Sequence, residues 1–411
     1  MSEHPYATTE VPGLAAVLKR SPEDFRVEEL PLYELEGAGD HIHFVVEKRG
    51  ITTNQLVRRV ASALGLSPGD IGVAGLKDAQ AVTRQMLSVE HRTPEQLLAL
   101  ELEEASVLSA ERHRNKLRRG HLAGNRFTIV LRECEAARIE EVRAVLDTLG
   151  RTGLPNAFGP QRFGARGDSA EIGRALLVSD HLGAIELIAG RVNEHDFGAV
   201  QAARELFDAG NFAGAASTWP RGYETSAKLC RAMDKHRGRA SRAIRALSKR
   251  ERAFYVSAWQ SGLFNRVLAE RMPRLDQLAA GEYAWNHGGR RYFEVRELEA
   301  ERARAERFEV SPAGPLYGPA SRLSAGEVGE LEERVLAESG LALSELEPRR
   351  FAGLEGGRRP LRVQPTELQV RAPDESSLEL CFALPEGAFA TSLVREIGKG
   401  LIATQSNAAS G

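Results

Sequence analysis

The stretch "IGVAGLKDAQAVTRQ", residues 71–85, places one carboxylate between two segments that have the pattern of β-strands. Residues 71–74 are apolar and partly β-branched, as in a buried strand, and Gly75 then lets the backbone turn without a side-chain penalty. From Val82 onward the residues alternate between two faces, which predicts a second strand. Asp78 is therefore expected at a rigid, hairpin-like corner, where an Asx-turn is one interpretation and a catalytic carboxylate is the other.

The length and composition predict two or three domains. With 411 residues the chain is too long for one ordinary core, and its apolar content of 42% is enough to fill several. No segment approaches the run of about 18 apolar residues that a membrane helix needs. The N-terminus also lacks the charged start and apolar run of a signal peptide. We therefore expect a cytoplasmic protein with no membrane partner.

The sequence gives no sign of a metal or a nucleotide cofactor. Cys134, Cys230 and Cys381 lie far apart and form no CxxC pair, so neither a disulfide framework nor a zinc site is expected. No Walker loop or GxGxxG fingerprint follows a predicted strand. The expectation is therefore no cofactor and no metal.

Positive charge is concentrated in one segment, although the formal net charge is only -2. Residues 228–252 hold ten Lys or Arg against two acids, and 47 of the 55 basic residues of the chain are arginine. A planar guanidinium can bind phosphate through two bonds and can stack on bases. The segment predicts an arginine-rich helix that contacts nucleic acid, although a high-GC genome would favour arginine equally well.

Alternation and capping signals predict the elements of the first half. In "HIHFVVEK", residues 41–48, Ile42, Phe44 and Val46 lie opposite His43 and Val45, as in a half-buried strand. One of the threonines at 52–53 is expected to cap a helix that Gly65 ends, and another helix is expected after Thr93.

The segment "RHRNKLRRG" places basic residues at every second position. If the segment is extended, these side chains project from one face and form a rail for backbone phosphates. A solvated edge strand protected by its charges is the alternative. The four residues are Arg112, Arg114, Lys116 and Arg118.

The second half predicts a helical insertion within one mixed α/β domain. A helix is expected to end at Gly150, and residues 153–164 are rich in Pro and Gly, as at a domain boundary. Residues 168–271 have a mostly helical pattern, and the charged residues 297–310 are typical of a solvated helix. Strand alternation returns at residues 378–384 and resembles the first half more than the middle.

Sequence blocks spread over almost the whole chain carry a family resemblance. They are "LKRSPEDFRVEELPLYELEGAGDHIHFVVEKRGITT" at 18–53, "AGLKD" and "AVTRQ" within 74–85, "KLRRGHLAGNRFTIVLR" from Lys116, "GLPNAFGPQRFG" from Gly153, "FYVSAWQSGLFN" from Phe254, and "LPEGAFATSLVREI" from Leu384. In this order and spacing they resemble the TruD family of tRNA pseudouridine synthases.

The resemblance implies an α/β (α+β) fold, in which a mixed, largely antiparallel pseudouridine-synthase sheet with flanking helices is split by a mostly helical, RNA-gripping insertion. It implies an isomerase that converts uridine 13 of tRNA to pseudouridine, with tRNA as its partner and no protein partner. The expected segments are a flexible tail at 1–11, the catalytic domain at 12–155 and 353–405, the insertion domain at 156–352, and a C-terminal tail at 406–411.

The implied reaction breaks an N-glycosidic bond, turns the base over and rejoins it through carbon with no net redox change. It needs a carboxylate, a pocket for a flipped nucleotide and exclusion of water, but no cofactor. By resemblance Asp78 is the catalytic residue. Lys19 is the cation that keeps it ionised, since a buried lone carboxylate tends to protonate. Lys77 is the sequence neighbour, but adjacent side chains on a strand point to opposite faces.

Four further residues match positions at the family's site. Phe25, Asn125 and Phe389 align with positions that contact the target nucleotide, and Phe127 aligns with one that lines the site. Aromatic faces can stack on a flipped base, and an amide can bind its Watson–Crick edge or a backbone group. For each phenylalanine taken alone, packing in the core is the alternative. The candidate RNA contacts are Arg112, Arg114, Lys116, Arg118, Arg162 and Arg242.

Two other functions remain open at this stage. One is the same chemistry on other RNA sites, and the other is a non-catalytic RNA-binding or tRNA-folding protein that retains the fold. The presence of Asp78 together with its expected neighbours argues against the second, because binding alone does not require the carboxylate. The sequence also leaves open whether Asp78 attacks the ribose, adds to the base, or removes a ribose proton to give a glycal.

Overall fold

The computed structural model describes residues 5–346 and 354–404 of the chain. It contains two compact units. The sheet unit consists of Tyr6–Pro155 and Val363–Gly411, and the inserted unit consists of Met1–Pro5 and Asn156–Arg362. The expected boundary at 352–353 and the expected tail at 406–411 lie outside the described residues.

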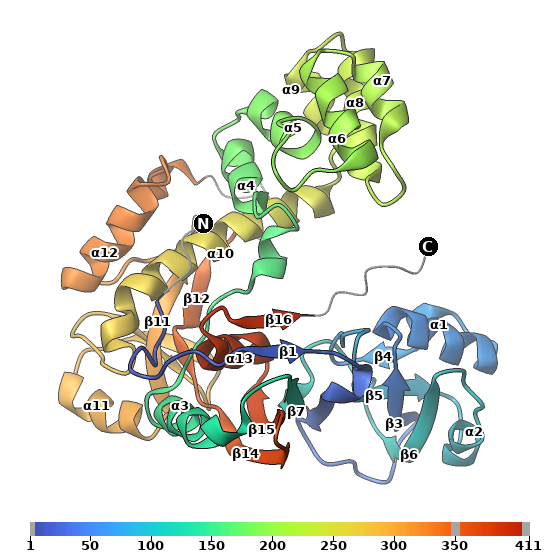
Figure 1. The fold of residues 1–411 in the computed structure, drawn as a ribbon, viewed down its shortest axis with the longest axis vertical. Helices are drawn as coiled ribbons and strands as arrows, with labels where there is room; N and C mark the ends of the chain where they lie inside the picture. The colour runs from blue at the N-terminus through green and yellow to red at the C-terminus, as the bar shows by residue number, and fades with distance from the viewer. Residues whose placement is uncertain (1–4, 347–353, 405–411) are drawn as a thin grey trace. The chain divides into compact units, whose positions relative to one another are not determined.

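Ten strands of the sheet unit form one mixed sheet (Figure 1). Its main order is β14-β15-β7-β2-β5-β3-β6, with β1 beside β7, β16 beside β1, and β4 beside β5. The pairs β2 with β5 and β1 with β16 are parallel, whereas the other pairs are antiparallel. The predicted mixed, largely antiparallel sheet is therefore confirmed. The strands are β1 Ala16–Leu18, β2 Phe25–Pro31, β3 His41–Arg49, β4 Gly72–Val73, β5 Val82–Glu90, β6 Ala105–His113, β7 Leu122–Arg132, β14 Thr366–Asp374, β15 Ser377–Pro385 and β16 Ile402–Thr404.

The helices of the sheet unit cover one face of the sheet in two groups. The apolar core beside α3 and α13 includes Phe25 and Phe127, and the core beside α1 includes Phe44. Strand pairing places these two cores on the same face, and between them lie the buried polar side chains of Lys48 and Gln85. A polar strip thus separates the two cores. The helices are α1 Thr53–Leu64, α2 Pro94–Leu98, α3 Ile139–Thr152 and α13 Ala390–Gly398, with the 3₁₀ turns η1 Pro22–Asp24, η2 Pro68–Asp70 and η3 Ala136–Arg138.

Capping determines where these helices begin and end. Thr52 is the N-cap of α1, where its hydroxyl accepts a hydrogen bond from the Gln55 amide, and Gly65 ends the helix with φ 66°. Both ends match the prediction. The helix after Thr93 is only one turn long. Helix α3 runs past the expected end at Gly150 because Gly153, with φ 97°, is its C-cap.

The inserted unit is mostly helical, as predicted. One apolar core contains side chains from each of the helices α4, α5, α6, α7, α8 and α9. A second core packs α10 against α12. The charged segment predicted as a solvated helix forms α11. Its helices are α4 Ser169–Leu177, α5 His181–Ala189, α6 Gly198–Asp208, α7 Phe212–Thr218, α8 Glu224–Lys235, α9 Ala240–Ala243, α10 Lys249–Arg271, α11 Leu298–Glu306 and α12 Gly326–Ala337, with the 3₁₀ turns η4 Pro160–Phe163, η5 Ile244–Ala246, η6 Met272–Arg274 and η7 Leu343–Glu345.

A small antiparallel sheet completes the inserted unit, in the order β10-β9-β11-β12. Two further short strands, β8 and β13, pair where the chain passes between the units. The bounds are β8 Leu154–Pro155, β9 Tyr283–Asn286, β10 Arg291–Glu294, β11 Val310–Leu316, β12 Gly357–Pro360 and β13 Arg362–Val363.

The N-terminal residues differ from the expected flexible tail at 1–11. Residues 1–4 lie outside those described, but Thr8 is buried, and its amide and hydroxyl both donate to the Glu396 carboxylate of α13. The Tyr6 ring lies against the Arg395 guanidinium at 4.1 Å. Residues 6–8 are therefore part of the packed sheet unit.

Within the described residues, no helix combines the length and apolar character needed to cross a membrane.

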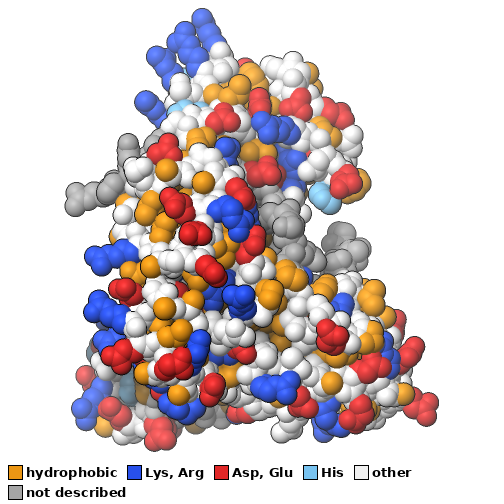
Figure 2. All heavy atoms as spheres, turned by 90° about the vertical axis from the view of Figure 1, so that its left-hand side faces the viewer, with side chains coloured by type: hydrophobic (Ala, Val, Ile, Leu, Met, Phe, Trp, Pro, Cys, Tyr) orange, Lys and Arg blue, Asp and Glu red, His pale blue; other side chains and the backbone are white. Residues whose placement is uncertain are grey.

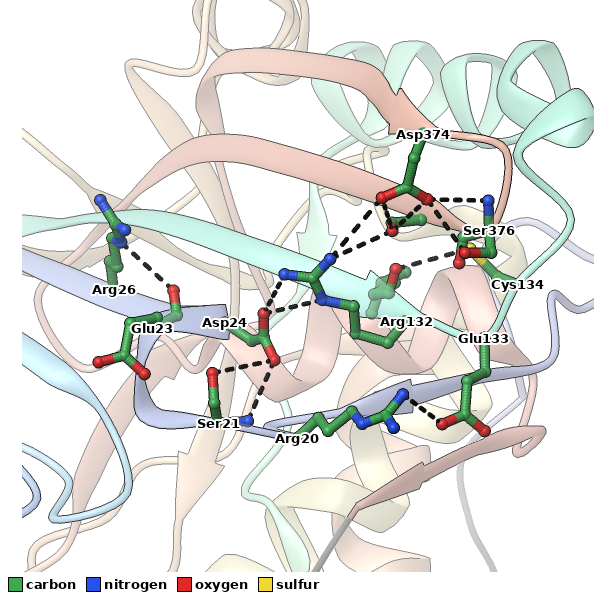
Figure 3. Close-up of polar contacts among 12 residues, drawn as sticks. Arg20, Ser21, Glu23, Asp24, Arg26, Arg132, Glu133, Cys134, Asp374 and Ser376 are labelled. Atoms are coloured by element: carbon green, nitrogen blue, oxygen red, sulfur yellow. Dashed lines mark hydrogen bonds and ion pairs between the residues drawn. The ribbon is translucent and has the colours of Figure 1, made fainter.

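A buried carboxylate fixes the turn between β1 and β2. Asp24 receives two hydrogen bonds from the Arg132 guanidinium, at 2.9 and 2.7 Å, and one from the Ser21 amide at 3.0 Å (Figure 3). The same guanidinium faces Asp374 at 3.9 Å, at the turn between β14 and β15. The network therefore ties the β1–β2 turn to β7 and to the far edge of the sheet.

We predict that Asp24→Ala lowers the free energy of unfolding by about 2–3 kcal/mol, because it removes charge-assisted hydrogen bonds to a buried carboxylate. Arg132 is partly exposed, so water can hydrate it in the variant and the cost stays below that of a fully buried unpaired charge. Denaturant unfolding measures the effect. Asp147→Ala, on the exposed face of α3, is the control and should change stability by no more than about 0.5 kcal/mol.

Candidate active site

Asp78 lies in the loop that joins β4 to β5, as the sequence predicts. Its side chain is 50% exposed, so it is not the buried carboxylate that was expected. Its Oδ2 atom accepts a hydrogen bond from Lys19 Nζ at 2.7 Å, which confirms the predicted ion pair. Within the described residues, its Oδ1 atom accepts no hydrogen bond. One oxygen is thus held by the protein and the other remains available to a ligand.

Lys19 reaches Asp78 from the turn between β1 and β2. Its backbone has φ 58°, in the left-handed region, where a non-glycine residue costs about 1 kcal/mol or more. The Asp24 network described above holds this turn in place. The Lys19 ammonium also lies 4.2 Å from the centre of the Phe25 ring, a distance suited to a cation–π contact. The ammonium thus contacts both the Phe25 ring and the Asp78 carboxylate.

Lys77 has Glu29 and Asn125 as its partners and not Asp78, in agreement with the expectation that adjacent side chains point to opposite faces. Its side chain is 5% exposed and forms an ion pair with Glu29, itself 4% exposed, at 2.7 Å. The Lys77 ammonium also donates to the Oδ1 atom of Asn125 at 2.6 Å. Asn125 is directly opposite Glu29 on the neighbouring strand. The two adjacent lysine and aspartate side chains therefore serve separate parts of the site.

Lys48 holds the backbone of the loop that bears Asp78. It is fully buried, and its ammonium donates to the backbone carbonyls of Ile51 at 2.6 Å and Asp78 at 2.7 Å. Burial lowers the pKa of Lys48 to about 8, an effect that the nearby Asp78 carboxylate partly offsets. Next to it, the Thr53 hydroxyl accepts from the Lys77 amide at 2.8 Å and donates to Gln85 at 3.0 Å. Buried polar groups thus hold the backbone on both sides of the Lys77–Asp78 peptide.

The aromatic candidates have different environments. Phe25 and Phe127 are buried, with ring centres 6.3 Å apart in an edge-to-face contact, and Phe127 stacks on Phe382 at 5.3 Å. Phe389 is 44% exposed at the N-cap of α13. The structure therefore brings Lys19, Phe25 and Asp78 together, and leaves Phe389 as the open ring among the predicted phenylalanines.

The predicted basic rail is wrong as a single extended row. Arg112 is in β6 and donates to the Gly39 carbonyl, but the strand ends at His113. Arg114 pairs with Glu36 at 2.7 Å in the turn that follows. Lys116 donates to the Gly69 carbonyl, and Arg118 is exposed in the same irregular segment. Because the chain turns after His113, the basic side chains no longer project from one face at every second position.

Of the other two predicted RNA contacts, Arg162 is bonded to the protein and Arg242 is exposed. Arg162, in η4, lies against α10 and donates to the hydroxyls of Ser257 and Ser261. Arg242 is exposed on α9. The segment 228–252 is not one helix, because it runs from α8 through α9 and η5 into α10, with Gly238 at φ 74° after α8.

Exposed cations nevertheless gather along this segment, and we call them the basic patch. Figure 2 shows a group of Lys and Arg side chains at the top of the face it displays, at the height where Figure 1 draws α7 to α9. Within the described part of the chain, only Lys228 pairs with a carboxylate, Glu251 at 3.9 Å. The patch consists of Lys228, Arg231, Lys235, Arg237, Arg239, Arg242, Arg245, Lys249 and Arg250.

Sequence reasoning missed the roles of Lys48, Thr53 and Glu29. A signal for Lys48 was present, because it continues the inward-facing series of Ile42, Phe44 and Val46 in β3. A lysine at the next inward position of a buried strand must find oxygen atoms inside the fold. The pairing of Glu29 with Lys77 had no such local signal, since it depends on which strands are neighbours.

Comparisons with known proteins identify the family of the chain. The family model for tRNA pseudouridine synthase D (TruD) matches residues 2–397. The tRNA pseudouridine synthase D of Geobacter sulfurreducens is 42% identical over 394 residues, which cover 96% of each chain. That of Geotalea daltonii is also 42% identical, and the match covers 96% of this chain and 100% of the relative.

A solved structure extends the likeness to the fold. A crystal structure from Methanosarcina mazei, assigned to tRNA pseudouridine synthase D, matches with a TM-score of 0.82 at 26% identity and covers 96% of both chains. The chain therefore belongs to the tRNA pseudouridine synthase D (TruD) family of isomerases that act on tRNA.

The buried ammonium predicts a specific pH dependence of stability. Because the pKa of Lys48 is about 8 in the folded protein and about 10.5 in an unfolded chain, the unfolded state alone holds this proton between those values. The free energy of unfolding should thus rise with pH in this window, by up to about 1.4 kcal/mol per unit from this residue.

Lys48→Met removes this contribution. The stability of the wild type relative to Lys48→Met should increase by about 3 kcal/mol between pH 8 and 10.5 and should be level below pH 8. Urea unfolding at several pH values measures the difference. A difference that stays constant across the window would contradict the lowered pKa. Lys235→Met, which removes an exposed lysine, is the control.

Proposed function

We propose that this protein converts uridine 13 of tRNA to pseudouridine, with Asp78 as the catalytic residue. The observation that carries the proposal is the half-exposed Asp78 carboxylate, which keeps one oxygen on Lys19 while the loop beneath it is held by buried polar groups. Membership of the TruD family supplies the reaction and the tRNA substrate.

The carboxylate is suited to each route that pseudouridine formation can take. Its Oδ1 atom can attack the ribose, add to the base, or remove a ribose proton, and in every case it must be ionised at the start. The Lys19 ammonium, 2.7 Å from Oδ2, is the counter-ion of this carboxylate. Since the loop backbone is fixed by Lys48 and Thr53, the carboxylate does not need to be ordered when the substrate arrives.

The target base needs surfaces that replace its stacking partners in the RNA. Phe389 offers an exposed ring for this purpose, and the Asn125 amide offers hydrogen bonds. Phe25 contributes an apolar ring against the Lys19 ammonium, and Phe127 packs against that ring. In this proposal the uridine lies between the carboxylate and these groups.

The basic patch of the inserted unit supports binding of the tRNA body. Eight of its nine cations have no carboxylate partner within the described residues, so their charge is available to phosphates. Contacts of this kind position an RNA without reading its bases. In this proposal, residues of the sheet unit recognise the target uridine.

We predict that Asp78→Asn lowers the rate of pseudouridine formation by about 10³-fold or more, because the amide can neither act as a base nor as a nucleophile. The measurement is pseudouridine mapping in unmodified tRNA after incubation with each protein. Asp70→Asn, at an exposed aspartate of η2 in the same segment, is the matched control and should retain the wild-type rate.

The outcomes of this assay separate the alternatives. Equal amounts of pseudouridine from Asp78→Asn and wild type would remove Asp78 from the reaction. Pseudouridine at positions other than 13 would assign the same chemistry to other RNA sites. Tight tRNA binding without pseudouridine would favour a non-catalytic tRNA-binding protein.

A second prediction concerns the basic patch. The triple variant Arg239→Gln, Arg242→Gln, Arg245→Gln should bind tRNA at least about tenfold more weakly at low salt. Its plot of log K against log salt should be shallower than that of the wild type by up to about 2–3, because each phosphate contact contributes about 0.7–0.9 to the slope.

The chain offers a matched control in the same unit. Arg296, Arg302 and Arg307 are also exposed arginines, but each is paired with a glutamate. Their replacement by glutamine should change tRNA affinity by less than about twofold, because a paired cation releases few counterions from RNA. Equal effects of the two triple variants would rule out a specific role for the basic patch.

A further inference from the structure

One row of the sheet brings together the polar groups nearest to Asp78. Glu29 on β2 and Asn125 on β7 are directly opposite one another, and the apolar pairs Val27 with Phe127 and Phe25 with Ile129 follow along the same two strands. Lys77, the residue before Asp78, reaches this row and contacts both Glu29 and Asn125. The row therefore joins a buried ion pair to an amide beside the catalytic loop.

The lysine determines which way the Asn125 amide points. An ammonium group has three hydrogen-bond donors and no acceptor, so the amide atom that lies 2.6 Å from Lys77 Nζ must be the oxygen. The ammonium cannot move away easily, because Glu29 holds it and both side chains are almost fully buried. Glu29 is itself held by the Met86 amide at 3.3 Å. The amide oxygen of Asn125 is thus held in its contact with Lys77.

The nitrogen of the Asn125 amide has no hydrogen-bond partner of this kind. Within the residues that the structure describes, no group accepts a hydrogen bond from Asn125 Nδ2, and the residue is only partly buried. Since the nitrogen lies on the opposite side of the amide from the oxygen, its N–H groups face away from Lys77. Asn125 therefore offers a ligand two unused N–H donors on this side, whereas its oxygen is turned toward Lys77, with one of its two lone pairs already occupied.

We propose that Lys77, fixed by Glu29, is a positioning residue that makes the Asn125 amide select uracil over cytosine. The N–H groups donate to O4 of the flipped uracil, where cytosine carries an amino group that is itself a donor. If the amide could turn, its oxygen would accept from that amino group and the discrimination would be lost. The inference rests on the proposed function and specifies how its site recognises the base.

The test compares dissociation constants for tRNA carrying uridine or cytidine at position 13, or at the position mapped in the assay above. The wild type should bind the uridine form about tenfold more tightly, as expected for one hydrogen bond. Asn125→Ala and Lys77→Met should each bring the ratio close to 1. Combining them should change it no further, because both remove the same interaction.

Two controls protect the result from effects on folding or on general affinity. If Lys77→Met leaves Glu29 buried without a partner and fails to fold, Lys77→Met combined with Glu29→Met removes both charges and should show the same ratio near 1. Lys235→Met, in the basic patch, should weaken both forms alike and keep the wild-type ratio. A wild-type ratio in either Lys77 variant that folds would overturn the proposal.

Thio-substituted tRNA identifies the oxygen that is recognised. Sulfur is a weak acceptor, so 4-thiouridine should bind the wild type like cytidine, whereas 2-thiouridine should bind like uridine. The reverse pattern, or a wild type that binds uridine and cytidine equally, would overturn the assignment to O4. Because these ratios need no turnover, pseudouridine formation in the same samples tests the proposed function separately.

Discussion

A lysine ammonium without access to water must be surrounded by oxygen atoms, and this requirement organises the site. Lys48 continues the inward face of β3, and it meets the requirement with the backbone carbonyls of Ile51 and Asp78. The loop that bears Asp78 is therefore attached to the core through its main chain. Because the main chain is held in this way, the Lys77 side chain can point inward to Glu29 while the Asp78 carboxylate points outward to Lys19.

The charges of the site also fit a polyanionic substrate. Three lysines, at 19, 48 and 77, surround two carboxylates, Asp78 and Glu29, and the pKa of Lys48 responds to both Asp78 and Lys77. The excess of one positive charge would be unfavourable in a dry core. In the proposed active site, this positive charge offsets the charge of the phosphates next to the target nucleotide.

Much of this arrangement could be predicted from sequence, because local patterns determine it. Strand alternation indicated β3 and β5, threonine and glycine caps marked α1, and the family resemblance paired Lys19 with Asp78. Predictions from local patterns failed where a turn interrupts a regular spacing of residues. The basic residues after Arg112 leave the strand, and Gly238 divides the arginine-rich segment into separate helices. The contact between Lys77 and Asn125 depends on strand order, which no single segment of sequence contains.

The strand order also has a consequence for the order of assembly during synthesis. β7 lies between β2 and β15, and β1 pairs with β16, although more than half of the chain separates β7 from β15. Lys19, Asp78 and Asn125 leave the ribosome early, but one edge of β7 stays unpaired until the inserted unit has been made and β15 follows it. An unpaired edge can join other chains. The nascent protein therefore depends on β15, which is made after the inserted unit, to protect this edge of β7.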